Sequence, residues 1–193
     1  MLRRVGVDGL LSSSRHHPPP TVPPPSPLFV TWKRTSRHGE ARLRGCIGIL
    51  EPRSLHASLR DYVLASSLRD RRFEPVAERE LPLLQCTVSL LHSFEPASDW
   101  RDWEIGVHGL IITFACPRTQ DMLTATFLPE VAHQEEWNHE ETIERLMRKA
   151  GAAPGTTPAA RRGLNIVRYQ SSARTMTYQE YCALKQGGAA AGA

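Results

Sequence analysis

The sequence predicts an α+β domain in which a mixed or antiparallel sheet is flanked by helices. Two observations support this class. The 193 residues, 40% of them hydrophobic and 23% charged, suit one domain that buries its own core without disulfides. Strand-like and helical segments do not alternate regularly along the chain, as they would in a doubly wound sheet. No run of 18 apolar residues is present, so we expect no membrane span.

Composition divides the chain into three parts. Residues 1–27 are rich in proline and basic residues and are predicted to be disordered, with a transit peptide as the alternative. Residues 28–185 form the predicted domain, and residues 186–193 a flexible tail of glycine and alanine. Basic residues outnumber acidic ones only within residues 1–42, so the body lacks the charge that nucleic-acid binding normally requires. Nucleic-acid binding therefore stays open but is not favoured.

The domain is predicted to begin with a β-hairpin followed by a helix. LFVTWK at residues 28–33 and RLRGCIGIL at residues 42–50 are β-rich runs joined by a polar loop, which predicts a hairpin. Apolar residues then recur at steps of three and four through residues 54–70, with Ser54 as the expected N-cap. Residues 73–84 contain two prolines and are predicted to form a loop.

The rest of the domain is predicted to contain further strands and two helices. The expected strands span residues 84–94, 104–114 and 123–129. Asn138 and Glu141 have the spacing of a capping box, so a helix should start there and end near Gly151. Residues 164–176 are predicted to be strand and turn, and a second capping box at residues 177–180 starts the last helix.

Cysteine and histidine spacing gives no sign of a metal or a cofactor. The four cysteines form no CxxC pair, which predicts free thiols rather than a zinc site: Cys46, Cys86, Cys116 and Cys182. HQEEWNHEE at residues 133–141 lacks the HExxH spacing and is interpreted as a solvated helix entry. No Walker or Rossmann glycine pattern occurs, so we expect no cofactor.

RLRGCIGIL holds the first candidate site residues. In an extended strand, alternation places Arg44 and Cys46 on one face, opposite the apolar side chains of Leu43, Ile47 and Ile49. A guanidinium beside the thiol would lower the pKa of Cys46. Gly45 and Gly48 would let a ligand or another backbone approach closely. The alternative is that Cys46 is a small buried residue beside a bulge.

EIGVHGLIITF at residues 104–114 holds the second group of candidates. As a strand it would place Glu104, Gly106 and His108 on one face, too far apart for Glu104 to touch His108. His108 could then meet Cys46 from a neighbouring strand, with Glu104 orienting the ring, in a thiolate–imidazolium pair. The alternative is structural: His108 caps a turn, and Glu104 pairs with a surface arginine.

Several stretches together resemble the AMMECR domain family, the family of the AMME syndrome chromosomal region gene 1 protein. They are SPLFVTWK, LRGCIG, LHASLRDY, RRFEPV, ELPLLQCTVSLL, DWEIGVHGL, TATFLPEVA and LMRKAG. The resemblance runs from about Ser26 to Lys185 and implies an α+β domain with a larger and a smaller lobe. It also implies that LRGCIG is the family signature. A helix is expected before SPLFVTWK in this family, whereas this sequence has a proline-rich segment there.

The resemblance implies no established activity. It implies a protein partner, of the Memo type, and a location in the nucleus, the cytoplasm or both. The favoured function is a partner- or ligand-binding regulatory module whose site is a cleft shared by RGCIG and EIGVHG, with Arg44, Gly45, Gly48 and Gly106 as its binding residues. The first alternative is an enzyme that uses Cys46 as nucleophile or redox thiol, assisted by His108 and Glu104.

Overall fold

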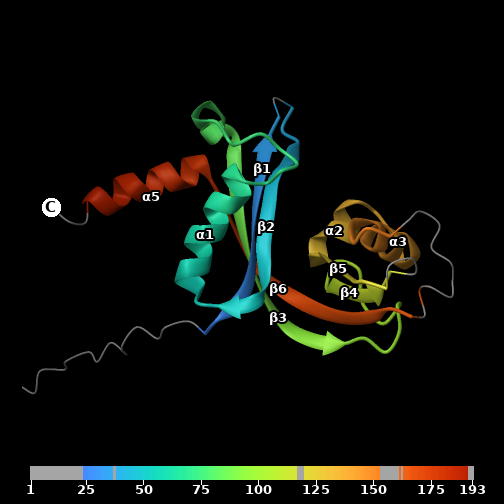
Figure 1. The fold of residues 1–193 in the computed structure, drawn as a ribbon. Coiled ribbons are helices and arrows are strands. Elements are labelled where there is room, and N and C mark those ends of the chain that lie inside the picture. The colour runs from blue at the N-terminus through green and yellow to red at the C-terminus, as the bar shows by residue number, and fades with distance from the viewer. Residues whose placement is uncertain (1–23, 37, 117–119, 153–160, 162, 191–193) are drawn as a thin grey trace, which may run out of the picture.

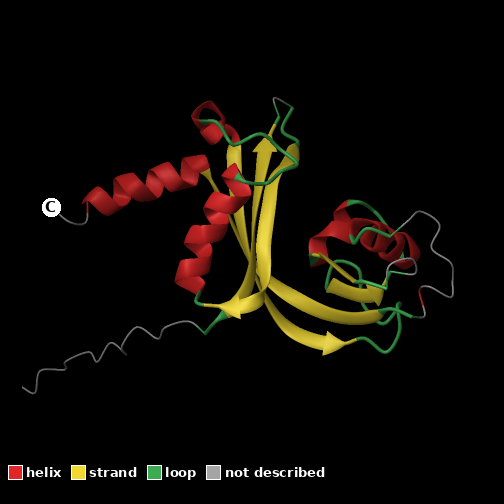
Figure 2. Ribbon diagram, viewed as in Figure 1, coloured by secondary structure: helices red, strands yellow, loops and turns green. Residues whose placement is uncertain are grey.

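The computed structural model describes residues 24–36, 38–116, 120–152, 161 and 163–190. A six-stranded antiparallel sheet forms its centre, in the order β2-β1-β3-β6-β4-β5 (Figures 1 and 2). The strands are β1 (Ser26–Thr35), β2 (Ala41–Arg53), β3 (Leu84–Pro96), β4 (Gly109–Ala115), β5 (Met122–Phe127) and β6 (Asn165–Thr177). The helices are α1 (Leu55–Leu68), the 3-10 helix η1 (Glu78–Leu83), α2 (Pro129–Gln134), α3 (His139–Lys149) and α5 (Tyr178–Ala190). The predicted α+β class is confirmed.

The long strand β6 joins the two lobes of the molecule. Its second part pairs with β3 in the larger lobe, and its first part pairs with β4 in the smaller one. Figure 1 shows β3 and β6 curving from the larger lobe, where α1 lies beside β1 and β2, towards β4, β5, α2 and α3. The sheet is therefore continuous, but its two ends carry different helices.

Each lobe has a core that its own helices cover. In the smaller lobe, α3 places Ile143 and Leu146 against Leu110 and Ile112 of β4, all at most 1% exposed. In the larger lobe, Leu28 and Val30 of β1 are fully buried.

Tyr169 of β6 lies between the lobes, where its hydroxyl donates to the Phe127 carbonyl at 3.0 Å. Tyr169 also belongs to an apolar cluster against which Phe29 of β1 and Val131 of α2 pack, so side chains from both lobes meet there.

Most predicted elements are confirmed. The hairpin forms from β1 and β2, and both capping boxes are present, with Asn138 accepting from the amide of Glu141 and Glu180 accepting from that of Thr177. Ser54 starts α1, although its side chain makes no cap hydrogen bond. The expected loop at residues 73–84 contains η1, and α2 was not predicted.

Several predicted boundaries are wrong. Residues 104–108 form a turn, and β4 begins only at Gly109. β6 continues without a turn to Thr177. α5 extends to Ala190, into the segment expected to be a flexible tail. Residues 1–23 of the expected disordered segment lie outside the described residues, as do residues 191–193, and β1 already begins at Ser26. No helix in the described part of the chain is long and apolar enough to cross a membrane.

Candidate functional site

A cavity of about 420 Å³ lies between the two lobes, on the face of the β1–β2 hairpin that α1 does not cover. Trp32 and Gly45 face α1: the indole Nε1 donates to Ser66 Oγ at 3.0 Å. Thr31 and Cys46, paired across the two strands, face the other way. The cavity walls also include Phe29, Lys33, Ala41, Arg42, Leu43, Arg72, Thr126, Phe127, Leu128, Glu130, Val131, Gln134, Glu135 and Lys149.

The Cys46 thiol forms part of the cavity wall and is hydrogen-bonded to Thr31. Sγ lies 3.2 Å from the Thr31 hydroxyl, and Thr31 itself is only 8% exposed. Burial raises the pKa of Cys46, and the Thr31 hydrogen bond together with the charges of Arg72 and Lys149 opposes that effect only in part. Burial thus favours the thiol over the thiolate, contrary to the predicted lowering of the Cys46 pKa.

Asp70 holds the backbone of Cys46 and the side chain of Arg72 together. β2 is an edge strand, so the outward N–H and C=O of Cys46 have no neighbouring strand. The Asp70 carboxylate accepts from the Cys46 amide at 2.9 Å, and Arg72 Nη2 donates to the Cys46 carbonyl at 3.0 Å. Arg72 also donates to Asp70 through Nε at 2.9 Å and Nη2 at 2.7 Å. The pair thus completes the strand edge and fixes the guanidinium at the cavity.

Lys149, the last residue of α3, brings a second cation to the cavity. Its Nζ donates to the Thr126 carbonyl at 2.8 Å and lies 4.8 Å from the centroid of the Phe127 ring. Partial burial lowers the pKa of Lys149, the charge of Arg72 lowers it further, and Cys46 acts in the opposite direction. In the ranges that the structure describes, no carboxylate lies within ion-pair distance of its ammonium group.

Arg44 does not share a face with Cys46, contrary to the prediction. Trp32 pairs with Gly45 and Lys33 with Leu43, so Arg44 is the extra residue of a β-bulge. The bulge shifts the alternation by one residue.

The bulge turns the Arg44 side chain towards η1. There its Nε and Nη2 donate to the two carboxylate oxygens of Glu80 at 3.0 and 2.9 Å. The same ion pair raises the pKa of Arg44 and lowers that of Glu80 to about 2. Arg44 therefore stabilises the larger lobe and does not activate the thiol.

Gly45 and Gly48 permit close packing within the protein. A Cβ on Gly45 would overlap the backbone carbonyl of Ser66 in α1, and one on Gly48 would overlap the carbonyl of Leu28 and the ring of Phe29. Neither glycine leaves an open space for a ligand. The close approach predicted at these positions is thus made by the protein's own backbone and side chains.

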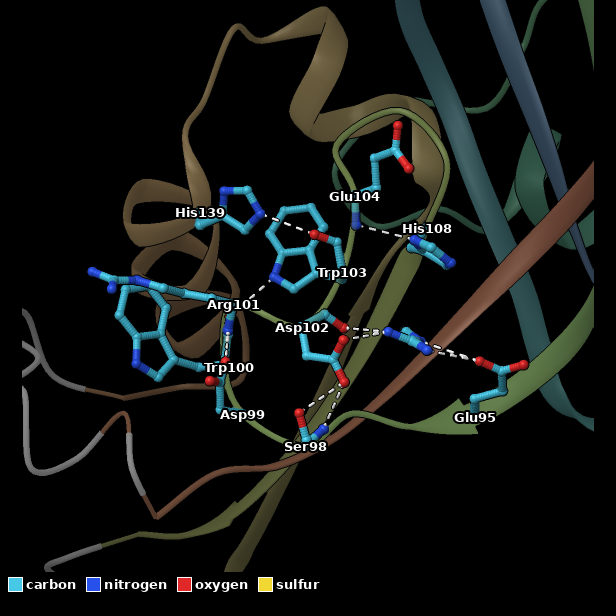
Figure 3. Close-up of polar contacts among 11 residues, drawn as sticks. Glu95, Ser98, Asp99, Trp100, Arg101, Asp102, Trp103, Glu104, His108 and His139 are labelled. Carbon is cyan, nitrogen blue, oxygen red and sulfur yellow. Dashed lines mark hydrogen bonds and ion pairs between the residues drawn. The ribbon is translucent and has the colours of Figure 1, made fainter.

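The second group of candidates lies outside the cavity, so the predicted shared cleft of RGCIG and EIGVHG is not formed. Glu104, Gly106 and His108 are absent from the cavity walls. The backbone N–H of Glu104 donates to His108 Nδ1 at 3.0 Å, which closes the turn drawn in Figure 3. Gly106 has a φ of +85° and packs beside His133 of α2. His108 therefore caps a turn, as the structural alternative predicted. The prediction that Glu104 and His108 are too far apart to touch is wrong, because the Glu104 amide donates to the His108 ring.

The polar link before this turn is anchored by Arg168 of β6. Arg168 donates to Glu95 through Nη2 at 3.0 Å and to Asp102 through Nη1. Trp103 is 6% exposed, with its indole donating to the Trp100 carbonyl at 3.0 Å. These contacts build the smaller lobe.

Sequence reasoning missed most residues of this cavity. Thr31, Arg72 and Lys149 are far apart in the chain and share no recognisable spacing. The family resemblance did contain a usable signal. At least one wall residue of the cavity comes from each of five stretches that carry the resemblance: SPLFVTWK, LRGCIG, RRFEPV, TATFLPEVA and LMRKAG. Among the described residues, no group of three or more His, Cys, Asp or Glu is placed to hold a metal ion.

Acid is expected to destabilise the larger lobe through Asp70 and Glu80. Their pKa values are about 2 in the folded protein, against 3.8 and 4.5 for free carboxyl groups, because arginines and backbone N–H groups stabilise the carboxylates. A lowered folded-state pKa stabilises the protein fully above about pH 5, and this contribution is lost as the pH falls towards 2. Urea unfolding between pH 7 and pH 3 should show this decline.

The matched variants for the acid experiment are Glu80→Gln and Glu51→Gln. Glu51 lies on β2 of the same lobe, and its side chain is 70% exposed. Glu80→Gln should flatten the decline of the unfolding free energy with acid, and Glu51→Gln should leave it unchanged. A free energy of unfolding that stays constant from pH 6 to pH 3 would contradict the prediction.

Comparisons with a family model, with related sequences and with a solved structure all point to the same family. The AMMECR1 family model matches residues 6–174. An uncharacterised protein of Arabidopsis thaliana is 54% identical over 155 residues, which cover 80% of this chain and 72% of that protein. An uncharacterised protein of Schizosaccharomyces pombe is 39% identical over 157 residues, which cover 80% and 77%. The crystal structure of an uncharacterised protein of Pyrococcus horikoshii aligns with a TM-score of 0.69 at 26% identity, covering 81% of this chain and 76% of that one.

Proposed function

The chain belongs to the AMMECR1 family, and from this premise we propose that the domain binds a small ligand in the cavity beside Cys46. The observation that carries the proposal is the convergence of distant segments. The hairpin of β1 and β2, the loop at residues 70–72, the β5–α2 connection and the end of α3 all contribute to one cavity. Folding thus brings both lobes to the same ligand-sized space.

The size and lining of the cavity are typical of a small-molecule site. Ligand pockets measure about 300–1,000 Å³ and combine apolar walls with a few polar groups, and this cavity measures about 420 Å³. Phe29, Phe127 and Val131 supply apolar surface, while Thr31 and Lys149 supply polar atoms. This combination favours binding over a purely structural void, which would be apolar and closed.

Binding is favoured over catalysis by the thiol. A nucleophilic cysteine needs a nearby base or a lowered pKa. Here burial raises the pKa of Cys46, and His108 lies in a turn outside the cavity walls. The wider role, as a regulatory module that acts with a Memo-type partner in the nucleus or cytoplasm, stays a prediction from the family resemblance.

The proposal is tested by filling the cavity. Leu43 lines it and is 43% exposed, so Leu43→Trp should occupy space without disturbing the core. Small fragments titrated into the full chain are expected to shift the amide NMR signals of Thr31, Cys46 and Val131. In Leu43→Trp the same fragments should bind about tenfold more weakly, a loss of about 1.4 kcal/mol.

Leu184→Trp is the matched control, because Leu184 is 63% exposed on α5, away from the cavity walls. Its fragment affinities should equal those of the wild type. If fragments bind Leu43→Trp as tightly as the wild type, or shift only amides outside the cavity walls, the proposed binding site is wrong.

A further inference from the structure

We infer that the ligand of this cavity is a small organic anion, with its carboxylate or phosphate group held between Lys149 and Arg72. The inference rests on the proposed function and adds the chemical class of the ligand. It is carried by two cations from different lobes that face one cavity, each with hydrogen-bonding capacity left unused by the described residues.

Lys149 is the first of these cations. An ammonium group has three N–H donors, and the only acceptor that the described residues offer it is the Thr126 carbonyl, at 2.8 Å. Its pKa is shifted by partial burial, Arg72 and Cys46, with no carboxylate among the causes. Lys149 is exposed, and no carboxylate pairs with its ammonium group among the described residues, so an anion placed there gains charge-assisted hydrogen bonds from the free N–H donors.

Arg72 is the second cation, and Asp70 holds it in position. Nε and Nη2 are used by Asp70 and by the Cys46 carbonyl. Within the described residues Nη1 has no acceptor, and the Arg72 side chain is 54% exposed at the cavity. Because the guanidinium is already ordered, an anion that accepts from Nη1 loses little additional conformational entropy.

The charges around the cavity favour an anion over a cation. Its walls contain four cations, Lys33, Arg42, Arg72 and Lys149, and two carboxylates, Glu130 and Glu135, and the Asp70 carboxylate pairs with Arg72 from outside the walls. Lys33 donates to Gln134, and Arg42 pairs with Glu40 at 3.0 Å. Arg72 lowers the pKa of Lys149, so the two cations repel each other when no ligand is bound. A negative group between them removes that repulsion.

The ligand also has an apolar part. Phe29, Leu43, Phe127, Leu128 and Val131 form much of the wall, and burying them against a ligand contributes about 25 cal/mol per Å². The Phe127 ring lies 4.8 Å from Lys149 Nζ, so an apolar surface directly adjoins the charged end. Inorganic phosphate alone would leave this surface uncovered, and an organic anion covers both parts.

Three probes of similar size test the inference: phenyl phosphate, phenylacetate and the uncharged phenylacetamide. Each is titrated into the full chain, and binding is followed by the amide NMR signals of Thr31, Cys46 and Lys149. We expect the two anions to bind at least tenfold more tightly than phenylacetamide. The ratio between phenyl phosphate and phenylacetate then distinguishes a phosphate ligand from a carboxylate ligand.

Variants at Lys149 separate charge from packing. Lys149→Met keeps an apolar stem beside Phe127 but removes the charge, and should weaken anion binding about tenfold, whereas Lys149→Arg should retain most of it. Lys185→Met, on the exposed face of α5, should bind like the wild type. Unchanged amide spectra outside the cavity confirm that each variant is folded.

The outcomes distinguish this inference from the proposed function. If phenylacetamide shifts the cavity amides as strongly as the anions, or if Lys149→Met binds anions like the wild type, the cavity still binds ligands but the anion inference is wrong. If none of the three probes shifts the cavity amides, the anion inference is overturned, and the fragment titration of Leu43→Trp decides the proposed function independently.

Discussion

Gly45→Ala is expected to lower the free energy of unfolding by about 3 kcal/mol, at the upper end of overpacking effects. The new Cβ would overlap the backbone carbonyl of Ser66, and a backbone atom of a helix cannot rotate away as a side chain can. Ser66 is 1% exposed and accepts the hydrogen bond from Trp32. Relief of the clash requires α1 to move away from β2, which breaks this hydrogen bond. Urea unfolding followed by circular dichroism measures the loss.

Gly187→Ala is the matched control for Gly45→Ala. Gly187 lies in α5, and a Cβ there meets nothing within 4 Å. Because alanine favours a helix over glycine by up to about 1 kcal/mol, the control should be as stable as the wild type or slightly more stable. If Gly45→Ala unfolds at the same urea concentration as Gly187→Ala, the packing of α1 on β2 is looser than the structure indicates.

Local sequence patterns correctly predicted the helices and strands that are specified by residues close together in the chain. The β1–β2 hairpin has β-rich runs on both sides of a short polar loop, and the pairing of Asn138 with Glu141 marks the start of α3. Such signals depend on neighbouring residues only, so they are visible in one sequence. The class of the fold follows from the order of these elements.

Two local errors explain why the predicted site was misplaced. Alternation assumes an unbroken register, but the bulge at Arg44 inserts one residue and changes the face of the strand. The run at residues 104–108 has a strand-like composition, yet Gly106 adopts a positive φ and the amide of His108 donates to the Glu104 carbonyl at 2.9 Å. No spacing rule predicts either feature.

The remainder of the candidate site depends on tertiary structure. Cys46 lies on β2, Arg72 in the loop at residues 70–72 and Lys149 on α3, and they line one cavity because the curved sheet brings the smaller lobe towards the β1–β2 hairpin. The family resemblance marked the stretches that contain these residues. It did not indicate which side chains face the cavity, because that depends on the register of β1 and β2.

Asp70→Asn is expected to have the second largest effect, a loss of about 2–3 kcal/mol in the free energy of unfolding. Asp70 is 7% exposed, and its carboxylate accepts four hydrogen bonds, one from the Cys46 amide and three from Arg72. An asparagine has the same shape, but one of its two ends is an NH₂ group, which donates. Whichever way the amide is turned, this NH₂ group faces N–H donors of Cys46 or Arg72, and those donors lose their acceptor. Urea unfolding at pH 7 measures the cost.

Asp61→Asn, at an exposed position of α1, is the control and should stay within about 0.5 kcal/mol of the wild type.

A second measurement on Asp70→Asn, its affinity for phenylacetate, separates an effect on stability from an effect on the geometry of the site. Without the carboxylate, the Arg72 side chain is no longer fixed, so a folded Asp70→Asn protein should bind phenylacetate more weakly even when it is fully native. Wild-type stability in Asp70→Asn would contradict the role of Asp70 at the strand edge. Reduced stability with unchanged phenylacetate affinity would instead show that Arg72 does not contact the anion. The two results can differ because Asp70 supports the strand edge through the Cys46 amide and fixes the cavity cation through Arg72.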